Sequence, residues 1–261
     1  MDATERGRDA PAAESAGERQ VRVTADGSRT LYDPAAGQTL HSGRGALAEA
    51  RHVYLEASGV AARLSEGRAT RVVEVGLGVG LDLLVTAEAA VAGGANLHVR
   101  ALDLGLPSPE AVAAMAFGSV VDPELADAWS TLLGELRGAR ADDAGLVTAV
   151  LVPGVTLELA LGDATAGPDA APSPAAARLL EPEWAHAVYH DAFSPSATPE
   201  LWSDAFLGAC ARCLAPGGAW VSYTVAGAVR RRLEAHGLEP EKLPGPPGGK
   251  REMLRAIRPP G

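Results

Sequence analysis

The sequence of 261 residues has few aromatic side chains and contains no long apolar run. Only 4% of the residues are Phe, Trp or Tyr although 47% are hydrophobic, so we expect a core built mainly from Ala, Val and Leu. Because no apolar stretch reaches the roughly 18 residues of a membrane-spanning helix, we predict no membrane association. The first residues also lack the apolar segment of a signal peptide, which favours a cytoplasmic protein.

Cysteine is scarce as well. Cys210 and Cys213 are the two cysteines, and they lie in a segment with a helical pattern. The C-x-x-C spacing occurs in zinc sites and in redox pairs. Since no second pair exists and no strand–turn context surrounds this one, we interpret both as ordinary helix residues in a reducing compartment and predict no metal site.

Basic residues are fewer than acidic ones. The chain has 23 Lys and Arg against 33 Asp and Glu, which gives a net charge of −10 and argues against broad, nonspecific binding of nucleic acid. The positive charge is concentrated near the end, where residues 230–261 contain eight Lys or Arg and four Glu. A local basic surface on an acidic protein is therefore compatible with the sequence.

Glycine, in contrast, is abundant, and three glycines alternate after an apolar segment. Residues 71–75 (RVVEV) predict a buried parallel strand, and the leucine-rich residues after the glycines predict a helix. A strand, a glycine turn and a helix N-terminus form the opening unit of a nucleotide-binding α/β domain. The pattern E-x-G-x-G-x-G, formed by Glu74, Gly76, Gly78 and Gly80, resembles the first motif of S-adenosylmethionine-dependent methyltransferases. A tight turn in another α/β fold is the alternative.

Aspartates follow three further predicted strands. The strand at residues 97–102 leads to Asp103, 23 positions after the last glycine of the motif. An acidic residue at about this distance accepts hydrogen bonds from ribose hydroxyls in nucleotide-binding folds. Asp163, after the third strand, is placed to bond an adenine amino group, and Asp191 follows the fourth. A turn-capping aspartate is the alternative for Asp103, and an N-cap or turn aspartate is the alternative for Asp191.

The remaining pattern predicts one domain with a small N-terminal extension. Residues 1–20 are expected to form a disordered tail, residues 21–66 a hairpin and a helix, and residues 70–261 a Rossmann-like core. We expect helices over residues 46–64, within 107–150 and over 199–214, a loop over 164–182, and strands at 71–75, 97–102, 155–161, 185–190, 219–224, 238–243 and 252–257. This order predicts an α/β fold with a seven-stranded sheet of the class I methyltransferase type.

Several segments resemble the MnmC-like methyltransferase family. The motifs that carry the resemblance are T-L-Y at 30–32, H-S-x-x-G-A-x-x-E-x-x-H-V-Y-L at 41–55, E-V-G-L-G-V-G-L-D at 74–82, D-A-F-S-P at 191–195 and K-R-E-M at 250–253. The resemblance implies a stand-alone enzyme, without the oxidase domain of bifunctional members, that uses S-adenosyl-L-methionine to methylate 5-aminomethyl-2-thiouridine at the tRNA wobble position. The family usually has Asn where this chain has Asp82, which would bring an extra negative charge near the cofactor's methionine end or bind its ammonium.

The resemblance also implies roles for individual residues. The expected cofactor-binding residues are Glu74, Gly76, Gly78, Gly80, Asp82, Asp103 and Asp163, and the expected substrate-binding residues are His41, Ser42, Phe193, Pro195, Lys250 and Arg251. Asp191 is the expected catalytic base. A primary alkyl amine has a pKa of about 10.4 and is mostly protonated at neutral pH, so a carboxylate that orients the amine and accepts its proton is needed. Phe193 and Pro195 would stack on the base, and Lys250 and Arg251 would contact phosphate.

Two other functions remain open at this stage. The acidic composition favours a methyltransferase of the same fold that acts on a small amine or another metabolite. A non-catalytic binding module is the second alternative, against which the intact glycines and the three strand-end aspartates argue. We expect tRNA as the partner and predict no partner protein.

Overall fold

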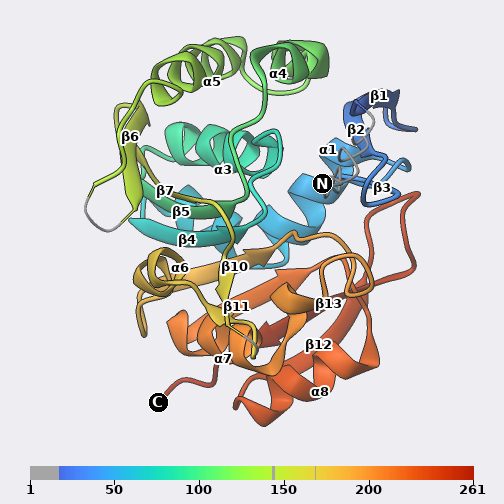
Figure 1. The fold of residues 1–261 in the computed structure, drawn as a ribbon, viewed down its shortest axis with the longest axis vertical. Coiled ribbons are helices and arrows are strands. Elements are labelled where there is room, and N and C mark those ends of the chain that lie inside the picture. Colours follow the sequence, from blue (N-terminus) through green and yellow to red (C-terminus); the bar gives the residue numbers. More distant parts are fainter. Residues whose placement is uncertain (1–17, 143–144, 168) are drawn as a thin grey trace, which may run out of the picture.

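A twisted sheet of eight strands forms the centre of the protein, in the order β12-β13-β11-β10-β4-β5-β7-β6 (Figure 1). The computed structural model describes residues 18–142, 145–167 and 169–261. The parallel strands are β4 (Thr70–Val75), β5 (Leu97–Asp103), β7 (Val155–Leu161), β10 (Ala185–His190) and β11 (Leu214–Ser222). The strands β6 (Leu146–Val152), β12 (Glu239–Pro244) and β13 (Glu252–Ile257) pair antiparallel on the two sides of them. The predicted α/β class and Rossmann-like arrangement are confirmed.

The predicted strand number of seven is wrong by one, because β6 was not expected. The stretch up to residue 150 was interpreted as helical, and the helices α4 (Pro109–Met115) and α5 (Pro123–Leu136) do occupy much of it. Beyond them, residues 146–152 are rich in Val, and they pair antiparallel with β7 across a short turn at Gly154. An antiparallel hairpin satisfies the backbone of an added edge strand at little cost in loop length.

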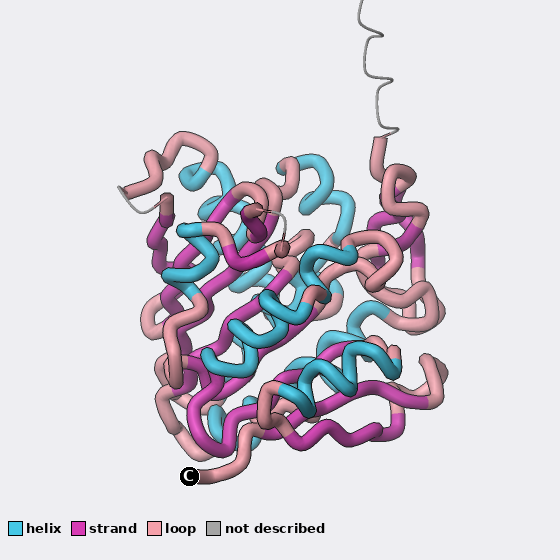
Figure 2. The backbone as a smooth tube through the Cα atoms, turned by 60° about the horizontal axis from the view of Figure 1, so that its bottom comes forward, coloured by secondary structure: helices cyan, strands magenta, loops and turns pink. Residues whose placement is uncertain are grey.

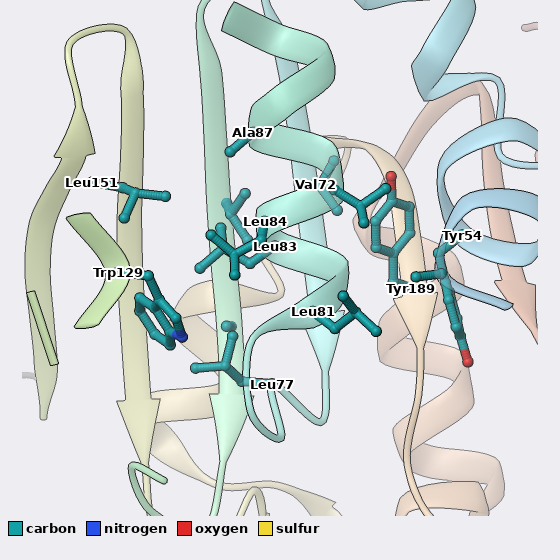
Figure 3. Packing of buried hydrophobic residues seen from close by; sticks show 14 of the residues in the cluster. Tyr54, Val72, Leu77, Leu81, Leu83, Leu84, Ala87, Trp129, Leu151 and Tyr189 are labelled. Carbon is teal, nitrogen blue, oxygen red and sulfur yellow. The ribbon is translucent and has the colours of Figure 1, made fainter. Parts of the chain in front are cut away.

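Helices cover both faces of the sheet (Figures 1 and 2). α3 (Leu81–Ala92) and α5 pack on one face, and α6 (Pro174–Leu179), α7 (Asp204–Cys213) and α8 (Gly227–Ala235) pack on the other. Each face has its own cluster of buried hydrophobic side chains. Figure 3 shows part of the first cluster, in which Trp129 of α5 lies near Leu77 of the glycine turn. The two cysteines are buried in the second cluster, where burial raises the pKa of both thiols.

Two further segments differ from the sequence-based expectation. The predicted loop over residues 164–182 contains the short strands β8 (Thr165–Ala166) and β9 (Ala171–Pro172) and the helix α6. Ser173 starts α6 by accepting a hydrogen bond from the N–H of Ala176, a capping signal that the Ala/Pro-rich composition obscured. The helix expected from residue 199 is split into a 3₁₀ turn, η3 (Pro199–Trp202), and α7. Another 3₁₀ turn, η2 (Phe117–Ser119), precedes α5.

The N-terminal extension is a small sheet followed by an interrupted helix. The expected hairpin is present as β1 (Gln20–Val23) and β2 (Arg29–Asp33), and β3 (Gln38–Thr39) adds a third strand. The helix expected over residues 46–64 consists of α1 (Ala46–Glu49), the π-helical segment η1 (Ala50–Glu56) and α2 (Val60–Ser65). Most of the predicted N-terminal tail lies outside the described residues. Among the described helices, none has the length and apolarity needed to cross a membrane.

Candidate active site

From β4, the chain adds β5 and β7 on one side of the sheet and then crosses to add β10 and β11 on the other side. The order of the strands therefore changes direction between β4 and β10. In open α/β sheets this switch point creates a crevice at the carboxyl ends of the strands, where ligands bind. A cavity, here called the first cavity, lies there. It is lined by residues from the ends of four strands and from the extension, among them Leu40, His41, Gly76, Gly78, Leu102, Asp103, Gly162, Asp163, Asp191 and Phe193. Of the seven predicted cofactor-binding residues, Gly76, Gly78, Asp103 and Asp163 line this cavity, whereas Glu74, Gly80 and Asp82 do not.

The three glycines of the motif have different tasks. All have positive φ angles, of 96° at Gly76, 56° at Gly78 and 90° at Gly80, which side chains with a Cβ rarely adopt. A Cβ at Gly76 would lie 2.7 Å from the carbonyl oxygen of Asp191, and one at Gly80 would lie 2.8 Å from the indole of Trp129. A Cβ at Gly78 would meet only a Leu40 methyl group, at 3.6 Å. Gly78 is therefore the glycine that leaves room for a ligand, whereas the other two allow close packing.

The carboxylate of Asp103 is fixed at the end of β5. Its Oδ2 accepts a hydrogen bond of 2.8 Å from the N–H of Gly78, and its Oδ1 accepts one of 3.3 Å from the N–H of Gly105. Burial raises the pKa of Asp103, and the backbone bonds from Gly78 and Gly105 oppose that shift. Asp163 is more exposed, and its Oδ1 accepts 2.9 Å hydrogen bonds from the N–H and the hydroxyl of Thr165.

A buried histidine lies between the buried carboxylate of Asp82 and the partly buried carboxylate of Asp191. Nε2 of His41 lies 3.6 Å from Oδ1 of Asp82 and 3.6 Å from Oδ2 of Asp191, and the His41 side chain is 3% exposed. Burial disfavours the imidazolium, but Asp82, Asp191 and Glu49 outweigh this effect and raise the pKa of His41 to about 10. His41 therefore carries a proton at neutral pH and partly neutralises an acidic site.

The same three side chains have a spacing compatible with a metal ion, since one ligand atom from each lies within 4.8 Å of the others. The protonated imidazole already places a positive charge between the two carboxylates. That the protein uses no metal ion remains a prediction.

In the described part of the chain, several buried polar atoms of this site lack hydrogen bonds, among them both ring nitrogens of His41. Oε2 of Glu74 and both carboxylate oxygens of Asp82 are buried and have no hydrogen-bond partner among the described residues. Burial, together with the neighbouring Asp82, Asp191 and Asp103, raises the pKa of Glu74 well above its usual range. Buried carboxylates without partners are costly unless a ligand supplies donors or positive charge. S-adenosyl-L-methionine carries an ammonium and a sulfonium, so these residues fit that cofactor.

A second cavity adjoins the first one. It is lined by residues of the extension and of the β10 and β11 ends, among them Gln38, Ser42, Glu49, Tyr54, Ser194, Ser222, Tyr223 and Lys250. Both cavities share the lining residues Leu40, His41, Asp191, Ala192 and Phe193. A group bound in the first cavity can therefore meet a group bound in the second beside His41 and Asp191.

Not every predicted substrate residue belongs to this lining. His41, Ser42, Phe193 and Lys250 do, and the Lys250 Nζ lies 4.4 Å from the centre of the Tyr223 ring. Within the described part of the chain, Pro195 and Arg251 line neither cavity. Pro195 lies half-buried in the loop after β10, and Arg251 is exposed at the start of the last hairpin strand.

Asp191 is held by both its backbone and its side chain. Its N–H donates to the carbonyl of Val75 at the end of β4 (2.9 Å), and its Oδ1 accepts a 2.5 Å hydrogen bond from the Tyr54 hydroxyl. Burial, Asp82 and Glu49 raise the pKa of Asp191 well above its usual range, although His41 and the Tyr54 hydroxyl oppose that shift. A carboxyl with a raised pKa in a cavity is suited to accept a proton near neutral pH.

Two residues of the site were not singled out from the sequence. Glu49 is 3% exposed, and its Oε2 accepts a 2.8 Å hydrogen bond from the N–H of Ser42. Burial, partly offset by His41, raises the pKa of Glu49 to about 7. Tyr54 is the second. The available signal was the motif at residues 41–55, in which both residues occupy fixed positions.

Comparison with known proteins identifies a matching family and similar relatives. A family described as S-adenosyl-L-methionine-dependent methyltransferase matches residues 124–259. The "tRNA 5-methylaminomethyl-2-thiouridine biosynthesis bifunctional protein MnmC" of Cupriavidus metallidurans is 35% identical over 243 residues, which are 87% of this chain and 32% of that protein. The protein of the same name from Burkholderia mallei is 32% identical over 86% of this chain and 33% of its own length. The chain thus spans about a third of the length of these relatives.

Among solved structures, MNMC2 from Aquifex aeolicus superposes with a TM-score of 0.70. The superposition covers 95% of this chain and 73% of that one, at 24% sequence identity. At this identity the likeness concerns the fold, and it extends over the N-terminal extension as well as the main sheet.

Proposed function

Because the chain belongs to the S-adenosyl-L-methionine-dependent methyltransferase family, we propose that it methylates the primary amine of 5-aminomethyl-2-thiouridine at the wobble position of tRNA. The observation that carries the proposal is the position of Asp191, a buried carboxyl where two cavities meet. The names of the MnmC relatives support the choice of nucleoside. A tRNA substrate also implies that the enzyme works in the cytoplasm.

The first cavity would hold the cofactor, which supplies a methyl group on a positively charged sulfur. Gly78 leaves its backbone open to the ligand, and Asp103 would accept hydrogen bonds from the ribose hydroxyls. Asp163 is the candidate for the adenine amino group. Glu74 and Asp82 line neither cavity, but Oε2 of Glu74 and both oxygens of Asp82 accept no hydrogen bond among the described residues, and these carboxyls would lie behind the ammonium of the methionine part.

Asp191 would prepare the amine for the reaction. The ammonium form of the substrate has no lone pair, so one proton must leave before nitrogen can attack the methyl carbon. Asp191 accepts that proton, and the new N–C bond then forms as the S–C bond breaks in line with it. The raised pKa of Asp191 makes it a stronger base than an exposed aspartate. Its site between the cavities brings the base to the amine.

The second cavity would receive the uridine. Phe193 belongs to the lining of both cavities and offers an aromatic surface against which a base can stack. Lys250 lies at the wall of the second cavity and is exposed, as a phosphate contact requires. Pro195 and Arg251 remain candidates only for contacts outside the cavity, with the loop and the backbone of the tRNA.

A small-molecule amine is the second candidate substrate, and the net charge of −10 is the observation in its favour. The two candidates are separated by methyl transfer from labelled S-adenosyl-L-methionine. The acceptors are tRNA from cells that lack this gene, tRNA from cells that contain it, and a panel of small primary amines. Labelling of the first tRNA alone supports the proposal. Cofactor binding without labelling of either tRNA would overturn it.

A further inference from the structure

We propose that Tyr54 is a positioning residue that orients Asp191 and sets the pH at which it accepts a proton. We further infer that the π-helical turn of η1 exists to bring Tyr54 to that place. The catalytic part of this inference rests on the proposed function, whereas the effect on the ionisation of Asp191 does not.

The contact itself is short, and it is partly buried. The Tyr54 hydroxyl donates to Oδ1 of Asp191 at 2.5 Å, and Tyr54 is 1% exposed. On the other side of the carboxylate, Oδ2 lies 3.6 Å from Nε2 of His41. The two oxygens of Asp191 therefore have different partners, a neutral hydroxyl and an imidazolium. Two partners on opposite oxygens fix the rotation of a carboxylate more strongly than either alone.

The helix geometry explains how Tyr54 reaches Asp191. Residues five apart on an α-helix point about 140° away from one another, because each residue turns by about 100°. In a π-turn, hydrogen bonds span five residues, and side chains five apart come to lie near the same face. Glu49 and Tyr54 are five apart across the start of η1, and both line the second cavity. A regular α-helix would turn one of them away.

The tyrosine ring has little freedom. Its centre lies 5.6 Å from that of Tyr189, at an interplanar angle of 48°, and Figure 3 shows the two rings side by side near α3. Burial, together with Asp191, Glu49 and Asp82, raises the pKa of Tyr54 well above its usual range. The hydroxyl thus keeps its proton wherever the enzyme works, and it acts as a permanent donor to Asp191.

The groups that face Asp191 come from several elements. Besides Tyr54 of η1, they are His41 after β3, Glu49 of α1 and Asp82 of α3. The two carboxyls raise the pKa of Asp191, and His41 and Tyr54 lower it. Loss of the Tyr54 donor leaves the other groups unchanged and therefore moves the pKa of Asp191 upward.

The first test compares Tyr54→Phe with Tyr189→Phe in methyl transfer to undermodified tRNA across pH. In Tyr54→Phe we expect the acid limb of the kcat profile to move to higher pH, and the plateau to fall about tenfold because the base is less well oriented. The KM for S-adenosyl-L-methionine should stay unchanged. Tyr189→Phe removes a hydroxyl that contacts Thr86 and should leave the acid limb in place. An unshifted limb in Tyr54→Phe would overturn the proposal.

The second test needs no substrate. Protein with ¹³C-carboxyl aspartate is titrated by NMR, and the Asp191 signal is assigned by its loss in Asp191→Asn. The midpoint of Asp191 should rise in Tyr54→Phe and not in Tyr189→Phe. If the midpoint rises but no tRNA is methylated, the proposed substrate is wrong and the role of Tyr54 stands. If the midpoint is unchanged, the inference about Tyr54 is wrong whatever the substrate.

Discussion

The N–H of Gly78 donates a 2.8 Å hydrogen bond to the carboxylate of Asp103, and this bond joins the glycine turn after β4 to the end of β5. Both residues line the first cavity. The turn that leaves space for the ligand and the acid that would bind its ribose are therefore one rigid unit. A change at Gly78 acts on both.

Substitutions at Gly78 and Gly80 should affect cofactor binding and stability differently. Gly78→Ala adds a methyl group at the lining of the first cavity without a steric clash, since its only neighbour within 4 Å is a Leu40 methyl group at 3.6 Å. We expect S-adenosyl-L-methionine affinity to fall at least about tenfold, with a stability loss of about 1–2 kcal/mol from the positive φ. Gly80→Ala forces a methyl group into the Trp129 indole and should cost about 1–3 kcal/mol more than that. Calorimetric binding and thermal unfolding measure the two effects. Equal stability losses in the two variants would contradict this assignment.

Replacement of the proposed base should uncouple binding from turnover. We expect Asp191→Asn to lower kcat by about 100-fold or more, the usual scale for loss of a general base. Affinity for S-adenosyl-L-methionine should change little, because the residues proposed to bind it, Gly78, Asp103 and Asp163, are unaltered. Single-turnover kinetics and calorimetry test this directly. Wild-type kcat in Asp191→Asn would remove Asp191 from the mechanism.

His41 predicts a pH-dependent contribution to stability. Its pKa is about 10 in the folded protein, above the ordinary 6.5. The imidazolium therefore stabilises the fold fully below about pH 6.5, and this contribution is lost as the pH rises through about 10. His41→Gln should lower the Tm most at pH 6, and the difference from wild type should shrink toward pH 10.

His190 supplies the matched control for that experiment. It is a fully buried histidine near Trp202 and Trp220, and burial lowers its pKa to about 3. His190 is neutral in the folded protein and, above about pH 7.5, in the unfolded chain as well, so the Tm loss in His190→Gln should be independent of pH from about pH 8 to pH 10. A pH-independent loss in His41→Gln as well would show that His41 carries no proton.

Lys250 should bind phosphate if tRNA is the substrate. We expect Lys250→Ala to raise the KM for tRNA and to reduce the slope of log KM against log salt by about one unit, the effect of one lost phosphate contact. Lys242→Ala is the control, since Lys242 is on the neighbouring strand and pairs with Glu252 at 2.7 Å. If both variants keep the wild-type salt dependence, Lys250 is no phosphate contact.

Much of the fold could be predicted because local signals agreed with each other. The β-branched run before Gly76 and the aspartate after residue 102 marked two adjacent strand ends, and the structure places them in one cavity. The strand β6 was missed for two reasons. As an edge strand of moderate burial, it shows only a weak alternation of apolar and polar residues, and it follows a long helix. The strand forms by pairing with β7, and the sequence pattern within β6 does not reveal that partner.

The site was harder to predict than the fold. Motif positions brought attention to His41 and Asp191, and their 3.6 Å separation became visible only in three dimensions. Glu49 and Tyr54 were missed because a helical pattern assumes 3.6 residues per turn, and the π-turn of η1 changes which side chains share a face. Pro195 belongs to the D-A-F-S-P motif at residues 191–195 but lines neither of the two cavities.

The central claim, methylation of a tRNA amine with Asp191 as the base, is tested most directly by nucleoside mass analysis. Undermodified tRNA is incubated with S-adenosyl-L-methionine and either the wild-type protein or Asp191→Asn, then digested to nucleosides. We predict that the wild type converts 5-aminomethyl-2-thiouridine to a product heavier by one methyl group and that the variant leaves it unchanged. An unmethylated nucleoside after incubation with cofactor-bound wild type would contradict the account.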